Sequence, residues 1–173
     1  MAQSLMSVGE YLRSSFRQDC DYVDGEIEER NWGERDHSVL QPAFGVVFHR
    51  NRDTWKVVPL PVQRVQVSET RIRVPDLCVS QRGDPRDQFV RTPPLICIEV
   101  LSPEDKLSRL QARVDDCVSL GVEHIWVVDP VTRHAYTAGP TGFIEVRSGE
   151  FTVPGTPIRV ALADLFAELD DES

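Results

Sequence analysis

Pro94-Leu95-Ile96-Cys97-Ile98-Glu99-Val100-Leu101 is the most hydrophobic run of this 173-residue chain, and its only charged residue is Glu99. A run of this length, rich in β-branched residues and bounded by prolines, is typical of a strand that is buried on both faces. A buried carboxylate costs free energy unless a partner compensates its charge. We therefore expect Glu99 to bind a metal ion, a basic side chain, or a second carboxylate through a shared proton.

A second acid, Asp76, lies in the run Ile72-Arg73-Val74-Pro75-Asp76-Leu77-Cys78-Val79. If the two runs form neighbouring central strands, Asp76 and Glu99 together could hold a divalent cation. Purely structural interpretations stand beside this one. Glu99 could instead form a buried ion pair with Arg113, and Asp76 could be a turn residue at the end of a strand.

Composition bounds the class of protein. With 40% hydrophobic and 27% charged residues, the chain is expected to form a single globular domain over residues 1–173, with a core of about 7–165. It has no apolar run long enough to span a bilayer and no signal-peptide pattern, so we expect no membrane contact. The four cysteines show no paired spacing, which favours buried thiols and a cytoplasmic location.

The net charge of −9 opposes nucleic-acid binding, because proteins that bind nucleic acids usually carry a basic face. The acids concentrate in segment 19–36 and in the C-terminal tail, and acidic runs are usually solvated. The middle of the chain has a local excess of arginine, which we interpret as solvated surface in preference to a phosphate-binding patch: Arg64, Arg71, Arg73, Arg82, Arg86 and Arg91.

Hydrophobic periodicity predicts alternating helices and strands. Helices are expected at 7–16, where Ser7 and Glu10 form a capping box, at 36–48 with Pro42 in the first turn, at about 105–120, and at about 161–169. The third helix has an apolar stripe of Leu107, Leu110, Val114, Cys117 and Val118, and ends at Gly121. Strands are expected at 22–28 (with a turn at 24–25), 55–58, 62–67, 72–79, 94–101, 124–129 and 158–160, with a hairpin at 133–138. His37 is interpreted as a capping or surface residue.

Four strings in this order resemble the Uma-type family of restriction-endonuclease-like proteins, within the PD-(D/E)xK nuclease superfamily. They are Asp21-Tyr22-Val23-Asp24-Gly25-Glu26, Val74-Pro75-Asp76, Ile98-Glu99-Val100-Leu101-Ser102-Pro103, and the segment from Gly121 to Pro130 that contains Trp126-Val127-Val128-Asp129. The resemblance covers roughly residues 7–165. It implies an α/β restriction-endonuclease-like fold, with a mixed central β-sheet flanked by α-helices.

The resemblance also implies a catalytic site. Asp76 and Glu99 match the two acids that hold Mg²⁺, with Mn²⁺ as its substitute, and the backbone carbonyl of Val100 and the side chain of Asp21 would complete the metal ligands. The superfamily's usual lysine position is Leu101 here, and the family's replacement on the next helix corresponds to Arg113. Gln111 matches a family glutamine near the site, and its amide is expected to face the sheet and contact Glu99 or a metal-bound water.

The sequence thus favours a Mg²⁺-dependent DNA endonuclease, in which a metal-activated water attacks the phosphodiester. Arg113 can stabilise negative charge but cannot act as a base, because guanidinium stays protonated. The alternative is a catalytically impaired nuclease-like domain that binds nucleic acid or a protein partner. A glycoside hydrolase that uses the same two acids is a third possibility. Cleavage of both strands of a duplex would favour a homodimer.

Overall fold

The structure, a computed structural model, describes residues 5–16, 19–31 and 34–170. Its helices are α1 (Val8–Arg13), α2 (Arg35–Trp55), α3 (Leu107–Leu120) and α4 (Leu162–Ala167). Its strands are β1 (Asp21–Val23), β2 (Glu26–Glu28), β3 (Val57–Pro61), β4 (Val65–Ser68), β5 (Arg71–Arg73), β6 (Leu77–Gln81), β7 (Ile96–Val100), β8 (His124–Asp129), β9 (His134–Gly139), β10 (Gly142–Glu145), β11 (Glu150–Thr152) and β12 (Arg159–Ala161).

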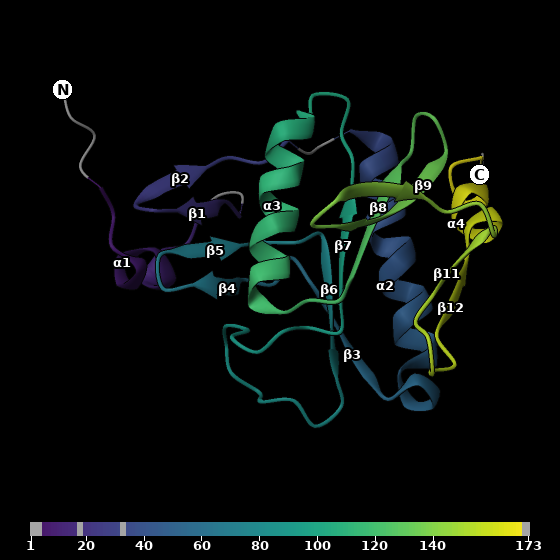
Figure 1. The fold of residues 1–173 in the computed structure, drawn as a ribbon, viewed down its shortest axis with the longest axis horizontal. Coiled ribbons are helices and arrows are strands. Elements are labelled where there is room, and N and C mark those ends of the chain that lie inside the picture. Colours follow the sequence, from purple (N-terminus) through teal and green to yellow (C-terminus); the bar gives the residue numbers. More distant parts are fainter. Residues whose placement is uncertain (1–4, 17–18, 32–33, 171–173) are drawn as a thin grey trace.

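A six-stranded sheet in the order β10-β9-β8-β7-β6-β3 forms the centre of the molecule (Figure 1). Strands β7 and β8 pair in parallel and the other neighbours pair antiparallel, so the expected mixed sheet is confirmed. Strand β7 is the apolar run that contains Glu99, and all five of its residues are buried. A parallel pair requires a crossover connection, and helix α3 supplies it between β7 and β8.

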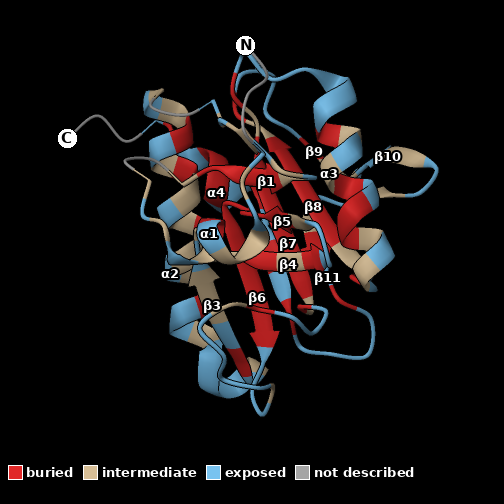
Figure 2. Ribbon diagram, turned by 90° about the vertical axis from the view of Figure 1, so that its left-hand side faces the viewer, coloured by how far each residue is buried: buried red, intermediate tan, exposed pale blue. Residues whose placement is uncertain are grey.

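The central sheet is covered on both faces, as the burial colours of Figure 2 show. On one face, Ile96, Ile98 and Val100 pack with α2, α4 and the β11–β12 hairpin. On the other face, Cys97 packs with residues of α3 and β4. Because side chains alternate along a strand, Glu99 must point to the same face as Cys97, toward α3.

A smaller four-stranded sheet in the order β2-β1-β5-β4 lies beside α3. Helix α1 packs against it through Tyr11, which shares a small core with Tyr22 and Ile72. The expected capping box of Ser7 and Glu10 is confirmed at the start of α1. The four-stranded sheet thereby places β1 and β5 close to the face toward which Glu99 points.

Helix α2 differs from its predicted limits. It begins at Arg35 and extends to Trp55, so Pro42 lies inside the helix rather than in its first turn. A proline inside a helix removes one backbone hydrogen bond, here to the carbonyl of Ser38. Both residues are exposed, so water can solvate that carbonyl, while Leu40, Phe44 and Phe48 are fully buried and hold the helix on the sheet.

Two further features concern the outside of the molecule. Strand β3 is an edge of the central sheet and contains Pro59 and Pro61. Leu107, expected in the apolar stripe of α3, is instead 68% exposed, at the first residue of the helix. No helix within the described ranges combines the length and the apolar character that crossing a bilayer requires.

Candidate active site

Strand register brings the two predicted acids together. Strands β6 and β7 pair antiparallel, with Leu77 opposite Ile98. One further step along the same register places Asp76 opposite Glu99. Asp76 Oδ2 accepts a hydrogen bond of 2.7 Å from the backbone amide of Val100, which fixes the carboxylate at the end of β7. Both acids are buried, with exposed fractions of 3% for Asp76 and 6% for Glu99.

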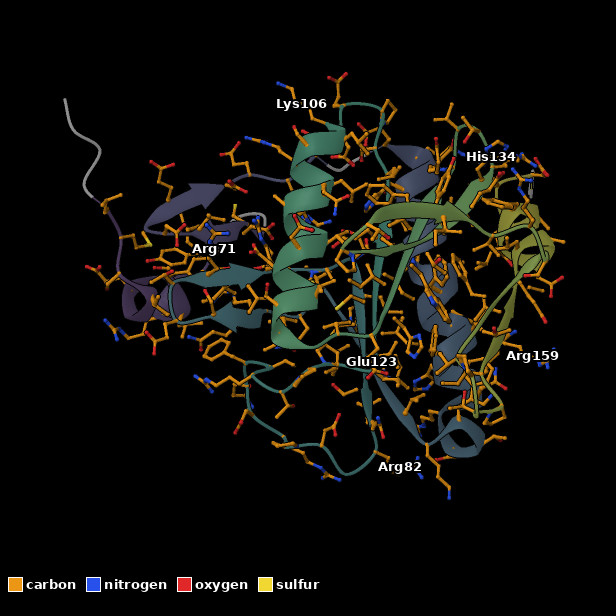
Figure 3. The ribbon with its side chains drawn as sticks, viewed as in Figure 1. Arg71, Arg82, Lys106, Glu123, His134 and Arg159 are labelled. Atoms are coloured by element: carbon orange, nitrogen blue, oxygen red, sulfur yellow. The ribbon has the colours of Figure 1, made fainter. Side chains whose placement is uncertain are left out.

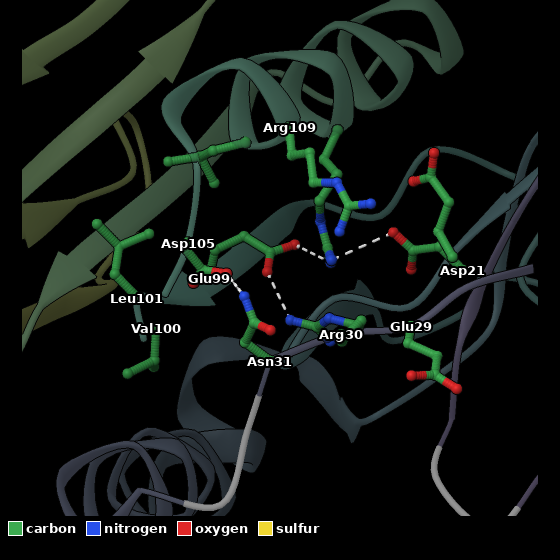
Figure 4. A pocket seen from close by; sticks show the side chains of 12 residues that line it. Asp21, Glu29, Arg30, Asn31, Glu99, Val100, Leu101, Asp105 and Arg109 are labelled. Carbon is green, nitrogen blue, oxygen red and sulfur yellow. Dashed lines mark hydrogen bonds and ion pairs between the residues drawn. The ribbon is translucent and has the colours of Figure 1, made fainter. Parts of the chain in front are cut away.

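A guanidinium group that the sequence did not point to, that of Arg30, lies between the two carboxylates, and Figure 4 shows its contact with Glu99. Nη2 of Arg30 donates to Asp76 Oδ1 at 2.9 Å and to Glu99 Oε2 at 3.0 Å. Nη1 of the same residue donates to the carbonyl of Val74. Arg30 comes from the segment between β2 and α2. One nitrogen atom therefore bridges the two acids.

His37 belongs to the site, which corrects its interpretation as a capping or surface residue. It is 2% exposed, and its Nε2 lies 3.2 Å from Asp76 Oδ1. The first turns of α2 run past the end of β6, so residues on the inner face of the helix reach Asp76. Gln41, one turn later, donates to the backbone carbonyl of Asp76 at 3.0 Å. Helix α2 thus fixes both the carboxylate and the backbone of Asp76.

Arg113 approaches Glu99 from α3, as expected. Its Nη2 donates to Glu99 Oε1 at 2.7 Å and to the carbonyl of Val74 at 3.1 Å. Its Nη1 lies 3.2 Å from Asp21 Oδ2. Arg30 and Arg113 therefore bind different oxygens of Glu99, and the buried ion pair that was one interpretation of Glu99 is present.

Asp21 is 1% exposed and lies behind Arg113. Its Oδ1 accepts from the amide of Val74 at 2.8 Å, and its Oδ2 is also 3.0 Å from Nη1 of Arg73. The solvated position expected for the acidic segment is thus wrong for Asp21. Its carboxylate binds Arg113 and Arg73 rather than pointing at the space between Asp76 and Glu99.

The ion pairs continue from Asp21 into the four-stranded sheet. Arg73 is 3% exposed and binds Asp116 of α3 at 2.7 Å. Asp116 in turn lies 3.0 Å from Arg71, which is labelled in Figure 3. The expectation of solvated surface is therefore wrong for Arg73, whereas Arg82, in the loop after β6, is exposed as predicted. We call the connected ion pairs the charge network; its members are His37, Asp76, Arg30, Glu99, Arg113, Asp21, Arg73, Glu28, Asp116, Arg71 and Asp24.

The surroundings shift the pKa values of Asp76 and Glu99 in opposite directions. Burial alone would raise the pKa of Asp76, but the charge of Arg30, the contact with His37 and the amide of Val100 outweigh it and lower that pKa. Burial raises the pKa of Glu99 above its ordinary value, although Arg113 and Arg30 oppose the shift. Burial would lower the pKa of His37, but Asp76 outweighs it and raises that pKa. Asp76 is thus the more firmly ionised member of the pair.

Two predicted residues occupy other positions. The amide of Gln111 donates to Asp115 Oδ1 at 2.8 Å and to the carbonyl of Gly139 at 3.4 Å, so the expected contact with Glu99 is absent. Val100 lines the pocket beside Glu99, together with Arg109 of α3. Sequence reasoning missed Arg30, His37 and Gln41. For Arg30 the sequence held one weak signal: it is one of only two basic residues in the acidic segment 19–36.

The donor atoms fit a hard divalent cation. Asp76 Oδ1 and Glu99 Oε2 both face the position of Nη2 of Arg30, and Mg²⁺ is commonly held by one or two carboxylates plus water. Within the part of the chain that the structure describes, no group of three or more His, Cys, Asp or Glu side chains is arranged to hold a metal ion. The candidate acidic metal ligands are therefore these two, and the backbone carbonyl of Val100 stays a prediction.

Comparisons with known proteins identify the family and the fold. A family model named Uma2 and described as "Putative restriction endonuclease" matches residues 8–154. The crystal structure of "a putative nuclease belonging to DUF820" from Anabaena variabilis ATCC 29413 superposes with a TM-score of 0.79 at 19% sequence identity, covering 95% of this chain and 99% of that chain. This likeness shows a nuclease-like fold. No curated protein matches the chain.

Proposed function

The chain belongs to the Uma2 family of restriction-endonuclease-like proteins, and on this premise we propose that it is a Mg²⁺-dependent DNA endonuclease. The observation that carries the proposal is the convergence of Asp76 Oδ1 and Glu99 Oε2 on one point. Two buried acids that share such a point would together offer two oxygen ligands to a doubly charged cation. The family and the fold favour phosphodiester cleavage over glycoside cleavage.

Each residue of the site has a separate role in this proposal. Asp76 and Glu99 would hold the cation, which when bound supplies a Lewis acid that lowers the pKa of a coordinated water. His37 and the amide of Val100 orient Asp76. Arg113 orients Glu99 through Oε1 and places a permanent positive charge beside the pair, where it can stabilise charge on a phosphate. Because Arg113 cannot accept a proton, the base must be another group.

A second candidate function is supported by a specific observation. Both acids already carry arginine partners, and arginine replaces the lysine that the family resemblance implies at position 113. These features favour a nuclease-like domain that binds nucleic acid or a protein partner without turnover. This candidate and the endonuclease differ in whether divalent cations support cleavage.

Assembly and location belong to the same proposal. Cleavage of both strands of a duplex would favour two active sites, so we propose a homodimer. Cys78, Cys97 and Cys117 are buried thiols on the side of the central sheet that α3 and β4 cover. Burial raises the pKa of Cys78 to about 12. Unreactive thiols that pack as small apolar residues support a reducing, cytoplasmic location.

A plasmid-cleavage assay tests the catalytic proposal. We expect the parent to cleave plasmid DNA with Mg²⁺ or Mn²⁺ and to lose cleavage in EDTA. Asp76→Asn keeps the shape of the side chain but removes its charge, and should lower the rate by about 100-fold or more. Asp53→Asn serves as the matched control, because Asp53 is an exposed acid of α2 with a side chain 76% exposed.

The outcomes separate the two candidates. Full activity in Asp53→Asn together with loss in Asp76→Asn supports the endonuclease. No metal-dependent cleavage by the parent, combined with retention of DNA in a mobility-shift assay, would favour the binding domain instead. Equal activity of Asp76→Asn and the parent would contradict the assignment of the site.

A further inference from the structure

Arg30 and a divalent cation would compete for the same two oxygens. Nη2 of Arg30 lies 2.9 Å from Asp76 Oδ1 and 3.0 Å from Glu99 Oε2. A Mg²⁺ ion bound by both carboxylates would lie about 2.0–2.1 Å from each oxygen. It would therefore need the same two oxygen atoms that accept from that nitrogen. Both groups are positively charged, so each opposes the presence of the other at these oxygens.

We propose that Arg30 is the residue that sets the cation affinity of the Asp76–Glu99 pair, because its guanidinium occupies the cation position and must leave those oxygens before a metal ion binds. The inference rests on the proposed function, since it takes the two acids as metal ligands. It adds a residue that neither the motif nor the fold identifies.

The contacts of Arg113 distinguish it from Arg30. Arg113 binds the other oxygen of Glu99, Oε1, and also Asp21. Its hydrogen bonds and ion pairs within the described part of the chain do not include Asp76 Oδ1 or Glu99 Oε2, so it can remain in place when a cation binds. Arg30, in contrast, bridges both acids through one atom. Arg113 therefore orients the carboxylate of Glu99, whereas Arg30 occupies the oxygens that a cation would need.

Arg30 is also held firmly in this position. Its side chain is 13% exposed, and Nη1 donates to the carbonyl of Val74. The next residue, Asn31, donates to Asp105 Oδ1 at 3.2 Å and accepts from Ser102 Oγ at 3.4 Å through its carbonyl. These bonds connect the segment of Arg30 to the loop after β7. The bridged arrangement is thus stabilised by neighbours, and a cation must displace it.

Population arithmetic gives the size of the effect. If the pair is free of Arg30 for a tenth of the time or less, the apparent dissociation constant for a metal ion is weakened about tenfold or more. Removal of the guanidinium restores the full affinity. We therefore expect Arg30→Gln to bind Mn²⁺ about tenfold or more tightly than the parent, as measured by calorimetric titration or by the electron paramagnetic resonance signal of free Mn²⁺.

Arg109→Gln is the matched control. Arg109 lines the same pocket and carries the same charge, but it is exposed, and no ion pair to Asp76 or Glu99 is found for it among the described residues. Its removal should change Mn²⁺ affinity less than about twofold, because exposed charges are screened by solvent. Addition of Glu99→Gln to Arg30→Gln should abolish the gain. Equal tightening by Arg109→Gln and Arg30→Gln would overturn the inference, because the effect would then be general electrostatics.

A measurement on the parent protein does not depend on the folding of a variant. Phenylglyoxal modifies accessible arginines, and peptide mass spectrometry can follow Arg30 alone. We expect Arg30 to be protected in EDTA and to be modified faster when Mn²⁺ is added, with Arg109 unchanged. Mn²⁺ binding without faster modification, or with equal affinity in Arg30→Gln and the parent, would overturn the inference and leave the endonuclease proposal standing. No Mn²⁺ binding by either protein would overturn both.

Discussion

At the scale of single residues, Arg73 shows what the buried charges require. Its Nη1 binds Asp21 at 3.0 Å and Glu28 at 2.9 Å, and its Nε binds Asp116 at 2.7 Å. A guanidinium has several donors in a fixed plane, so one arginine can serve three carboxylates. Removal of a charge from water is costly, and these three acceptors offset that cost. Truncation of Arg73 would remove one of two arginine partners from each buried acid, leaving Asp21 with Arg113 and Asp116 with Arg71.

Arg73→Met should therefore destabilise the protein by about 3–5 kcal/mol, because it breaks buried ion pairs while it keeps most of the apolar stem. The measurement is the free energy of unfolding from urea titration at neutral pH. Arg159→Met is the control, since Arg159 pairs with Glu150 at 2.8 Å but its side chain is 70% exposed. Its cost should be about 1 kcal/mol or less. Similar losses in the two variants would contradict this account of Arg73.

At the scale of elements, α1 depends on its partners. A helix of six residues is too short to be stable alone. Tyr11 anchors it: the ring is fully buried, packs against Phe16 and Tyr22, and donates its hydroxyl to the carbonyl of Cys20 at 2.5 Å. The guanidinium of Arg64 lies 4.7 Å from the centre of the ring. One buried tyrosine thus fastens α1 to the four-stranded sheet.

This anchor predicts a loss of stability in alkali. Burial raises the pKa of Tyr11 well above its usual value, while tyrosine in the unfolded chain ionises near pH 10. The unfolded state therefore releases its proton first, so the contribution of Tyr11 is complete below about pH 10 and is lost as the pH rises toward the folded value. Urea unfolding at pH 8 and pH 10.5 should show a larger drop for the parent than for Tyr11→Phe. The same pH dependence in both proteins would contradict the prediction.

At the scale of the whole molecule, the charge network connects the two sheets. It runs from His37 on α2 through Asp76 and Glu99 of the central sheet to Arg73 of β5. Separation of the four-stranded sheet from the core would leave buried charges without partners on both sides. The two sheets are therefore expected to unfold as one cooperative unit.

Native-state hydrogen exchange tests this coupling. The amides of β5 and of β7 should exchange with the same opening free energy, equal to that of global unfolding, because neither sheet can open alone. Arg73→Met should separate the two, with β5 exchanging more easily than β7. Early exchange of β5 in the parent would show that the four-stranded sheet is an independent unit.

The sequence was sufficient for β7 and β8 and for the meeting of Asp76 with Glu99, whereas the expected strand 72–79 divides into β5 and β6, which belong to different sheets. Continuous apolar runs mark buried strands, and a lone acid within such a run must have a partner. Arg30 could not be foreseen in the same way, because it comes from a loop without periodicity and reaches the acids only through the tertiary fold. Helix α2 was predicted too short because residues 49–54 are polar and do not continue the apolar periodicity, whereas Trp55 at the end of the helix packs against Phe48. The predicted contact of Gln111 with Glu99 was wrong for a local reason, because Asp115, one turn later on α3, accepts a hydrogen bond from the amide of Gln111.

The two prolines of β3 have a consequence for how copies of the protein can meet. The backbone amide of Val62 donates to the carbonyl of Asp76, and the amide of Arg82 donates to the carbonyl of Lys56. The backbone N–H and C=O groups of even-numbered residues in β3 therefore point toward β6. Pro59 and Pro61 consequently face outward, where a neighbouring strand would need N–H donors that proline lacks. Sheet extension from one molecule to another is blocked along this border, which guards the protein against fibrous aggregation.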